Sequence, residues 1–193
     1  LQIKQYESAR KALFQASEYS DNYPLTHYYL ATIDLEQGLV GSAMSNAYKF
    51  LGSVPGSVAG AKLAAKLELG QKAYGKAENL LLPVVAARPD DTEALNLLAS
   101  ALQAQGEDAE AAALLAKVAA LQPDSIGTRA RLGAILLEAE SDEQGVQALR
   151  DVLAIYPGYE QADVLIMLNY LRRVDLAAAI QAAREYLERN PNG

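Results

Sequence analysis

The sequence contains no cysteine and no tryptophan, and it has a single histidine, His27. Without cysteine the chain forms no disulfide, offers no thiolate to a metal and has no cysteine nucleophile. A Ser-His-Asp triad would have to include His27, and no Gly-x-Ser-x-Gly turn accompanies it. The sequence therefore predicts no enzyme activity, no cofactor and no metal site. We interpret His27 as a partly buried structural residue, with a catalytic or metal-binding role as the alternative.

The chain also lacks long apolar runs and an excess of positive charge. No apolar segment approaches the roughly 20 residues that span a bilayer, and the sequence opens with neither an initiator methionine nor a signal peptide. The formal net charge is -7 and the isoelectric point is about 4.8, whereas nucleic acids and anionic membranes bind concentrated positive charge. We expect a basic or neutral partner and no nucleic acid.

Phosphate-binding and calcium-binding patterns are missing as well. The glycines are scattered among turns, and no Gly-Lys-Ser or Gly-Lys-Thr occurs. One acidic run lacks the spacing of a calcium loop; it consists of Glu138, Glu140, Asp142 and Glu143. We interpret this run as a solvated turn whose charges favour the N-terminus of the following helix, with a cation site as the alternative.

The sequence does contain a repeat of 34 residues. Only Pro24 and Pro83 fall outside a series of prolines at this interval, which comprises Pro55, Pro89, Pro123, Pro157 and Pro191. A fixed period of this length indicates an array of one structural unit. The composition is 51% hydrophobic and rich in alanine and leucine, which is typical of helices.

Aligning the units on these prolines, at position 32, reveals further columns. Position 20 is always small, which indicates a close helix crossing; it holds Ala9, Ala43, Ala77, Ala111, Gly145 and Ala179. Positions 24 and 27 form an apolar stripe at helical spacing, and positions 7 and 8 do so in the first half of the unit. Each unit is therefore predicted to be two amphipathic helices. Ser141 and Gln144 resemble a capping box at the start of one second helix.

The small residues at positions 8 and 20, the apolar residues at 7, 24 and 27, and the proline at 32 resemble the tetratricopeptide repeat (TPR). The resemblance covers the whole chain and implies an all-α fold, a right-handed α-solenoid of antiparallel helix pairs. It predicts one continuous solenoid domain in which residues 1–23 are the second helix of a truncated unit and the full units span 24–57, 58–91, 92–125, 126–159 and 160–193. Because Leu1 falls at position 12, we expect a fragment of a longer array. Pro83 lies inside a second helix and should kink it.

A narrower resemblance concerns residues 128–138, 145–149 and 161–173, together with Leu82-Pro83. These stretches are similar to the TPR lipoproteins that accompany the PEP-CTERM/exosortase system of Gram-negative bacteria. The resemblance implies a periplasmic array in exopolysaccharide-producing strains, tethered to the outer membrane through a lipidated cysteine outside this chain. A generic cytoplasmic TPR adaptor is the alternative.

The TPR resemblance also implies which residues face a partner, because the first helices line the concave groove. The partner-facing positions hold Tyr28, Tyr29, Thr32, Lys62, Lys66, Asn96, Ser100, Arg131, Leu168 and Leu171. Lys62 and Lys66 lie one helical turn apart, and with Arg131 they would make the groove locally basic and suited to an acidic segment. The alternative is solvated lysines on a polar face. Position 9 of the second unit is Lys66 rather than asparagine, which disfavours the TPR class that binds chaperone tails.

Tyrosine is concentrated near the start of the chain, with Tyr6, Tyr19, Tyr23, Tyr28, Tyr29 and Tyr48 among the first 48 residues. These residues would serve core packing, a protein interface or contacts to sugars. We expect a non-catalytic scaffold whose concave groove binds a protein or peptide segment, with a polysaccharide-binding TPR module as the alternative function.

Overall fold

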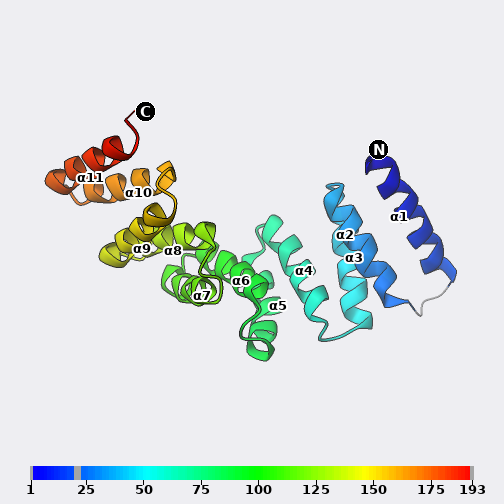
Figure 1. The fold of residues 1–193 in the computed structure, drawn as a ribbon. Helices are drawn as coiled ribbons and strands as arrows, with labels where there is room; N and C mark the ends of the chain where they lie inside the picture. Colours follow the sequence, from blue (N-terminus) through cyan, green and yellow to red (C-terminus); the bar gives the residue numbers. More distant parts are fainter. Residues whose placement is uncertain (1, 20–22, 192–193) are drawn as a thin grey trace. The chain divides into compact units, whose positions relative to one another are not determined.

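The computed structural model describes residues 2–19 and 23–191, and all regular elements in these ranges are helices (Figure 1). The prediction of an all-α helical repeat fold is confirmed. The chain divides into two compact units, Leu1–Ala101 and Leu102–Gly193. The predictions that concern Leu1 and the side chain of Tyr19 lie outside the described residues. None of the described helices is long and apolar enough to cross a membrane.

The first unit is a succession of helices joined by short turns. Its elements are α1 (Gln2–Tyr19), α2 (Pro24–Glu36), α3 (Val40–Ser53), α4 (Val58–Gly70) and α5 (Tyr74–Ala87). Helix α2 packs against α3 and α4 against α5, while α1 lies on α2 and α3 lies on α4. Helix α6 (Thr92–Gln105) contains the boundary between the two units.

The second unit repeats the same arrangement. Its elements are α7 (Asp108–Leu121), α8 (Ile126–Glu138), α9 (Asp142–Ile155), α10 (Glu160–Arg172) and α11 (Leu176–Arg189). Helices α8 and α9 form one pair and α10 and α11 another, with α7 on α8 and α9 on α10. Each range predicted as a full unit thus contains two helices, although the exact unit boundaries stay a prediction.

Small residues lie where the paired helices cross. Ala43, Ala77 and Ala111 are fully buried. Ala9, at the same position of α1, is exposed, so the expectation of a crossing is wrong there. Its helix packs only on α2 within the described residues, so no second helix covers this face.

The α8–α9 pair makes the closest approach through two glycines. A Cβ atom added to Gly145 would lie 2.6 Å from Leu137 Cδ2 and 2.9 Å from the carbonyl oxygen of Gly133. A Cβ atom on Gly133 would likewise meet Leu149 Cγ at 2.7 Å. The two backbones can lie this close only because neither residue has a side chain.

The apolar columns form the core between the helices. At positions 24 and 27 the buried residues are Ala47, Phe50, Leu81, Val84, Leu115, Val118, Leu149 and Val152. Positions 7 and 8 add Leu30, Ala31, Ala64, Ala65, Leu98, Ala99 and Ile166. The helices that carry these residues therefore bury the stripe that the sequence period predicts.

The helix N-termini show which serine side chains form capping hydrogen bonds. Ser57 caps α4 by accepting a hydrogen bond from the Gly60 amide at 3.2 Å. Ser141 occupies the N-cap of α9, but its side chain makes no capping hydrogen bond, so the predicted capping box is wrong. Acidic residues in the first turn of α9 stabilise that end instead. Helix α5 runs through Pro83 to Ala87.

Candidate functional site

The aromatic residues predicted to face a partner on α2 divide into a packed one and an exposed one. Tyr28 is half-buried, and its ring centroid lies 5.3 Å from that of Phe50 and 5.6 Å from that of Tyr29. Tyr29 remains 52% exposed. The Thr32 hydroxyl donates to the backbone carbonyl of Tyr28 at 3.0 Å. Of these three residues, Tyr29 presents the most surface to a ligand.

Lys62 is not the free cation that a basic groove requires. Its ammonium lies 3.0 Å from an Asp91 carboxylate oxygen and 2.5 Å from Glu93. Burial lowers the pKa of Lys62, but the hydrogen bonds and charges of Glu93 and Asp91 outweigh it and raise this pKa above its ordinary value. Asp91 also caps α6 through the Ala94 amide at 3.0 Å. The expectation of a locally basic patch is therefore corrected at Lys62, whereas Lys66 stays exposed.

The remaining predicted residues of α6 and α8 make contacts within the chain. Asn96 donates to the backbone carbonyl of Thr92 at 2.9 Å, and Ser100 donates to that of Asn96 at 2.9 Å. Arg131 donates to Gln103 at 3.3 Å. Burial of the Arg131 guanidinium lowers its pKa. These polar groups help to fix the helices that carry them.

The first helices α8 and α10 enclose a pocket of about 170 Å³. We call it the first-helix pocket, and its lining residues are Ala134, Leu137, Glu138, Leu165, Leu168, Asn169 and Arg172. Leu168, a predicted groove residue, is 55% exposed, and Leu171 one turn away is 50% exposed. The pocket is smaller than the roughly 300 Å³ of ordinary small-molecule sites. Its size suits one apolar side chain.

A buried amide gives this pocket a polar floor. Asn169 is 4% exposed, and its Nδ2 donor has no hydrogen-bond partner within the described structure. Its Oδ1 accepts from Arg172 at 3.0 Å, and Arg172 also donates to the backbone carbonyl of Leu137 at 2.7 Å. Arg172 therefore ties α10 to α8 and holds the asparagine in place. A buried donor without a partner is costly, which favours a ligand that supplies an acceptor.

Comparisons with known proteins bear on the helical-repeat fold. Residues 68–135 match a tetratricopeptide repeat family. The structure of YrrB, described as a TPR protein with an unusual peptide-binding site, superposes with a TM-score of 0.81 at 14% sequence identity. The match covers 95% of this chain and 94% of the YrrB chain. The matches support a TPR protein. No curated protein matches the sequence.

Two further TPR-like structures show the same fold. The MamA protein superposes with a TM-score of 0.78 at 20% identity, covering 87% of this chain and 92% of its own. A tetratricopeptide repeat protein from Parabacteroides merdae gives a TM-score of 0.77 at 16% identity, covering 97% of this chain and 75% of its own. At these identities the likeness concerns the fold.

The acidic run in the α8–α9 turn makes ion pairs with neighbouring arginines. Asp142 lies 3.3 Å from Arg172 and 3.4 Å from Arg173. In the part of the chain that the structure describes, no group of three or more histidine, aspartate or glutamate residues is arranged to hold a metal. Asp142 is therefore paired with Arg172 at the end of α10 and with Arg173, the C-cap of that helix.

Sequence reasoning missed the buried carboxylates of α2 and α4. Asp34 is fully buried, accepts from Ser42 at 2.5 Å and from Asn46 at 3.1 Å, and lies 2.9 Å from Arg10. Asn46 also bonds His27 at 3.2 Å, which gives the half-buried histidine a structural partner.

Glu68 is the second of these carboxylates. It is 2% exposed and accepts from the Tyr48 hydroxyl at 2.5 Å. Burial and the Glu68 carboxylate raise the pKa of Tyr48 to about 12. Asp34 and Glu68 both stand at position 11, which is leucine in the next two units. An acidic residue at position 11, where the next two units have leucine, is the sequence signal that could have predicted these buried carboxylates.

Proposed function

We propose that this chain is a non-catalytic scaffold that binds a segment of a partner protein along the first helices of its TPR units. The first-helix pocket is the observation that carries this proposal. It combines apolar lining residues, a buried amide donor without a partner within the described structure, and the exposed side chain of Leu168. A partner segment would place an apolar side chain in the pocket and a backbone carbonyl near Asn169. Such a pairing of an apolar anchor with one oriented polar group is typical of peptide recognition.

The test uses peptides selected from a displayed random library against the whole chain. We expect the selected peptides to share an apolar anchor and to lose affinity by about tenfold or more for Leu168→Lys, since a charge at the pocket mouth would have to be desolvated. Leu176→Lys is the matched control, because Leu176 is 59% exposed on α11 and does not line the pocket. Equal loss of binding in both variants would contradict the proposed site.

A polysaccharide ligand is the second candidate, favoured by exposed aromatic surface near the start of α2. Tyr23 is 66% exposed and Tyr29 is 52% exposed. Tyr29→Ala should reduce binding of the source strain's polysaccharide if sugars stack there. Lys66→Glu tests the acidic-segment hypothesis more cleanly than a change at Lys62, which would also disturb the cap of α6.

The cellular setting that we propose is the bacterial envelope, within an exopolysaccharide system of the PEP-CTERM/exosortase type. Its support is the sequence similarity at residues 128–138, 145–149 and 161–173. In this setting the parent protein is periplasmic and is tethered to the outer membrane through a lipid anchor outside this chain. Fractionation of the source bacterium tests it, because recovery of the parent protein in the cytoplasm would favour a cytoplasmic adaptor.

A further inference from the structure

A large hollow of the second unit lies on the second helices, with no lining residue shared with the first-helix pocket. It has a volume of about 700 Å³ and lies between α7 and α9 with α8 beneath it. We call it the α7–α9 hollow. Its apolar lining residues are Ala109, Ala112, Ala113, Ala116, Leu132, Leu136, Ala139 and Ala148. Figure 1 shows these three helices following one another within the second unit.

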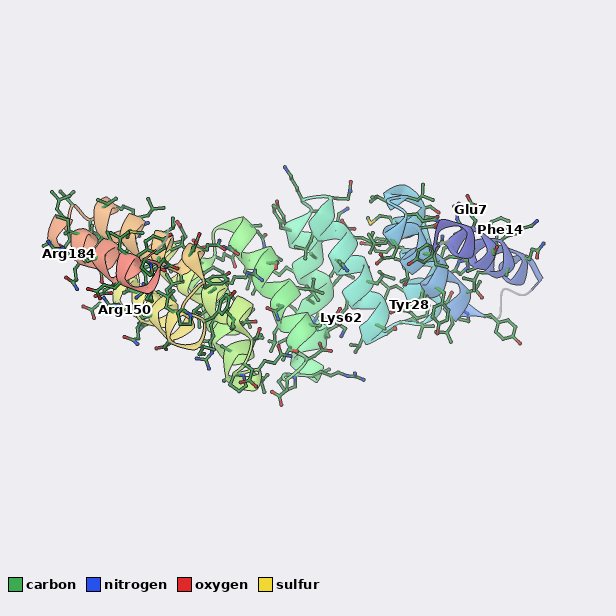
Figure 2. The ribbon with its side chains drawn as sticks, turned by 45° about the horizontal axis from the view of Figure 1, so that its top comes forward. Glu7, Phe14, Tyr28, Lys62, Arg150 and Arg184 are labelled. Atoms are coloured by element: carbon green, nitrogen blue, oxygen red, sulfur yellow. The ribbon has the colours of Figure 1, made fainter. Side chains whose placement is uncertain are left out.

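The hollow exists because α7 carries alanine where other second helices carry large side chains. Ala116 stands at position 25, which in the other units holds Phe14, Tyr48, Leu82, Arg150 and Arg184. Figure 2 shows the Phe14, Arg150 and Arg184 side chains on their helices. In the first unit Tyr48 reaches from α3 to Glu68 of α4 and bonds it at 2.5 Å. The corresponding pair in the second unit is Ala116 and Leu136, and both line the hollow.

The polar rim of the hollow is acidic. Its polar lining residues are Ser141, Glu143, Gln144, Gln147 and Asp151, and none of the lining residues is basic. Glu143, Gln144 and Asp151 are exposed. Gln147 donates to Asp151 at 2.8 Å, and because glutamine is neutral this hydrogen bond does not cancel the negative charge of Asp151. The hollow therefore combines an apolar floor with a negative edge along α9.

We propose that the α7–α9 hollow binds an amphipathic helix of a partner protein, with an apolar stripe flanked by lysine or arginine. Alanine walls let another helix approach closely, and the leucines of α8 supply apolar area to bury. An extended segment would leave its backbone N–H and C=O groups against alanine methyls, whereas a helix satisfies these groups internally. Basic residues beside the stripe complement Glu143 and Asp151.

The probe is a synthetic helical peptide with leucines spaced three and four residues apart and lysines on both sides of the stripe. Its matched control replaces every lysine with glutamate. Binding to the whole 193-residue chain is measured by fluorescence anisotropy at low and high salt. We expect the lysine peptide to bind about tenfold or more tightly than the glutamate peptide, and to weaken as salt rises.

Ala116→Tyr fills the hollow with the residue that the chain already uses at Tyr48. Ala116 is exposed, so the fold should tolerate the change, which circular dichroism verifies. We expect Ala116→Tyr to weaken the lysine peptide about tenfold or more, while Ala177→Tyr, at an exposed site on α11 outside the hollow, leaves it unchanged. Glu143→Gln combined with Asp151→Asn should remove most of the salt dependence without filling the hollow.

Unchanged binding by Ala116→Tyr, or equal binding of the two peptides, would overturn the proposal. A chain that binds neither peptide but self-associates until Ala116→Tyr prevents it would also overturn it, because the occupant would then be a second copy. Leu168→Lys separates this site from the first-helix pocket. It should leave the lysine peptide bound even if the proposed function fails.

Discussion

Among the individual residues, Asp163 is an ionisable side chain that is almost completely buried. The residue is 3% exposed, its Oδ1 pairs with Arg189, and its Oδ2 has no partner within the described structure. Burial raises the pKa of Asp163 above its ordinary value of 3.8, and Glu185 and Glu160 add to this, while Arg189 only partly opposes it. The folded chain therefore holds this proton more tightly than the unfolded chain does.

This raised pKa predicts a pH dependence of stability. Because the folded pKa exceeds the unfolded one, the contribution of Asp163 is fully present below pH 3.8 and is lost as pH rises through the folded pKa. The amide side chain introduced by Asp163→Asn does not titrate. The free energy of unfolding of the parent should thus fall relative to that of the variant across this window, as measured by urea unfolding at a series of pH values.

Asp124→Asn, which removes a charge from an exposed position, is the control for this measurement. A parent-minus-variant difference for Asp163 that stays flat with pH would mean that Arg189 balances the effect of burial, and a difference that grows with pH would mean that Arg189 outweighs it.

For Lys62, the sequence predicts the helix face on which the residue lies but not its ion-pair partners. The repeat places Lys62 on a first helix, but its partners Asp91 and Glu93 stand at the start of α6 about 30 residues later. A helical period fixes which face a residue lies on, whereas the ion pair depends on how the next first helix packs beside it. The same limit explains why Asn169 and its Arg172 contact were not predicted.

Among the helices, the 34-residue period predicts the elements well because its small column and its apolar columns each have one physical role. From α3 onward, small residues at position 20 lie at helix crossings and apolar residues at positions 24 and 27 contribute to the core. The period does not reveal the α7–α9 hollow, because alanine on an exposed face is equally common where nothing binds. It becomes visible only when α7 and α9 are placed over Leu132 and Leu136.

The α8–α9 crossing predicts the cost of adding a methyl group at Gly145. In Gly145→Ala the new Cβ would meet Leu137 at 2.6 Å and the Gly133 carbonyl oxygen at 2.9 Å, so the backbones must separate. We expect the free energy of unfolding to fall by about 1–3 kcal/mol, as for other overpacked cores. Thermal or urea unfolding followed by circular dichroism measures this change.

Gly127→Ala on α8 is the matched control, because nothing lies within 4 Å of its added Cβ. Stability there should stay the same or rise by up to about 1 kcal/mol, since alanine favours helix. A similar loss at both glycines would mean that helix crossing is not the cause.

At the scale of the whole molecule, the contacts described within each unit are mostly between helices that follow one another. Helix α9 packs on α8 and α10, and some helices two apart also touch, as α8 does with α10 and α2 with α4. In such an array, the total stability is approximately the sum of the stabilities of the single repeats and of the interfaces between neighbouring repeats. A destabilising substitution therefore affects the helices near it most. Ligand binding in the second unit would then stabilise the nearby helices most.

Gly145→Ala tests this locality by hydrogen exchange. Deuterium uptake should rise first in α8 and α9, then in α7 and α10, which contact them, while α2 and α3 keep the uptake of the parent. Mass spectrometry of peptic peptides resolves these segments, and Gly127→Ala gives the baseline. Because Gly145 lies in the second unit, an equal rise over α2 and α3 would show that the two units unfold as one cooperative body. If only the second unit loses protection from exchange, a partner could bind to the α7–α9 hollow or leave it without disturbing the helices around Lys62.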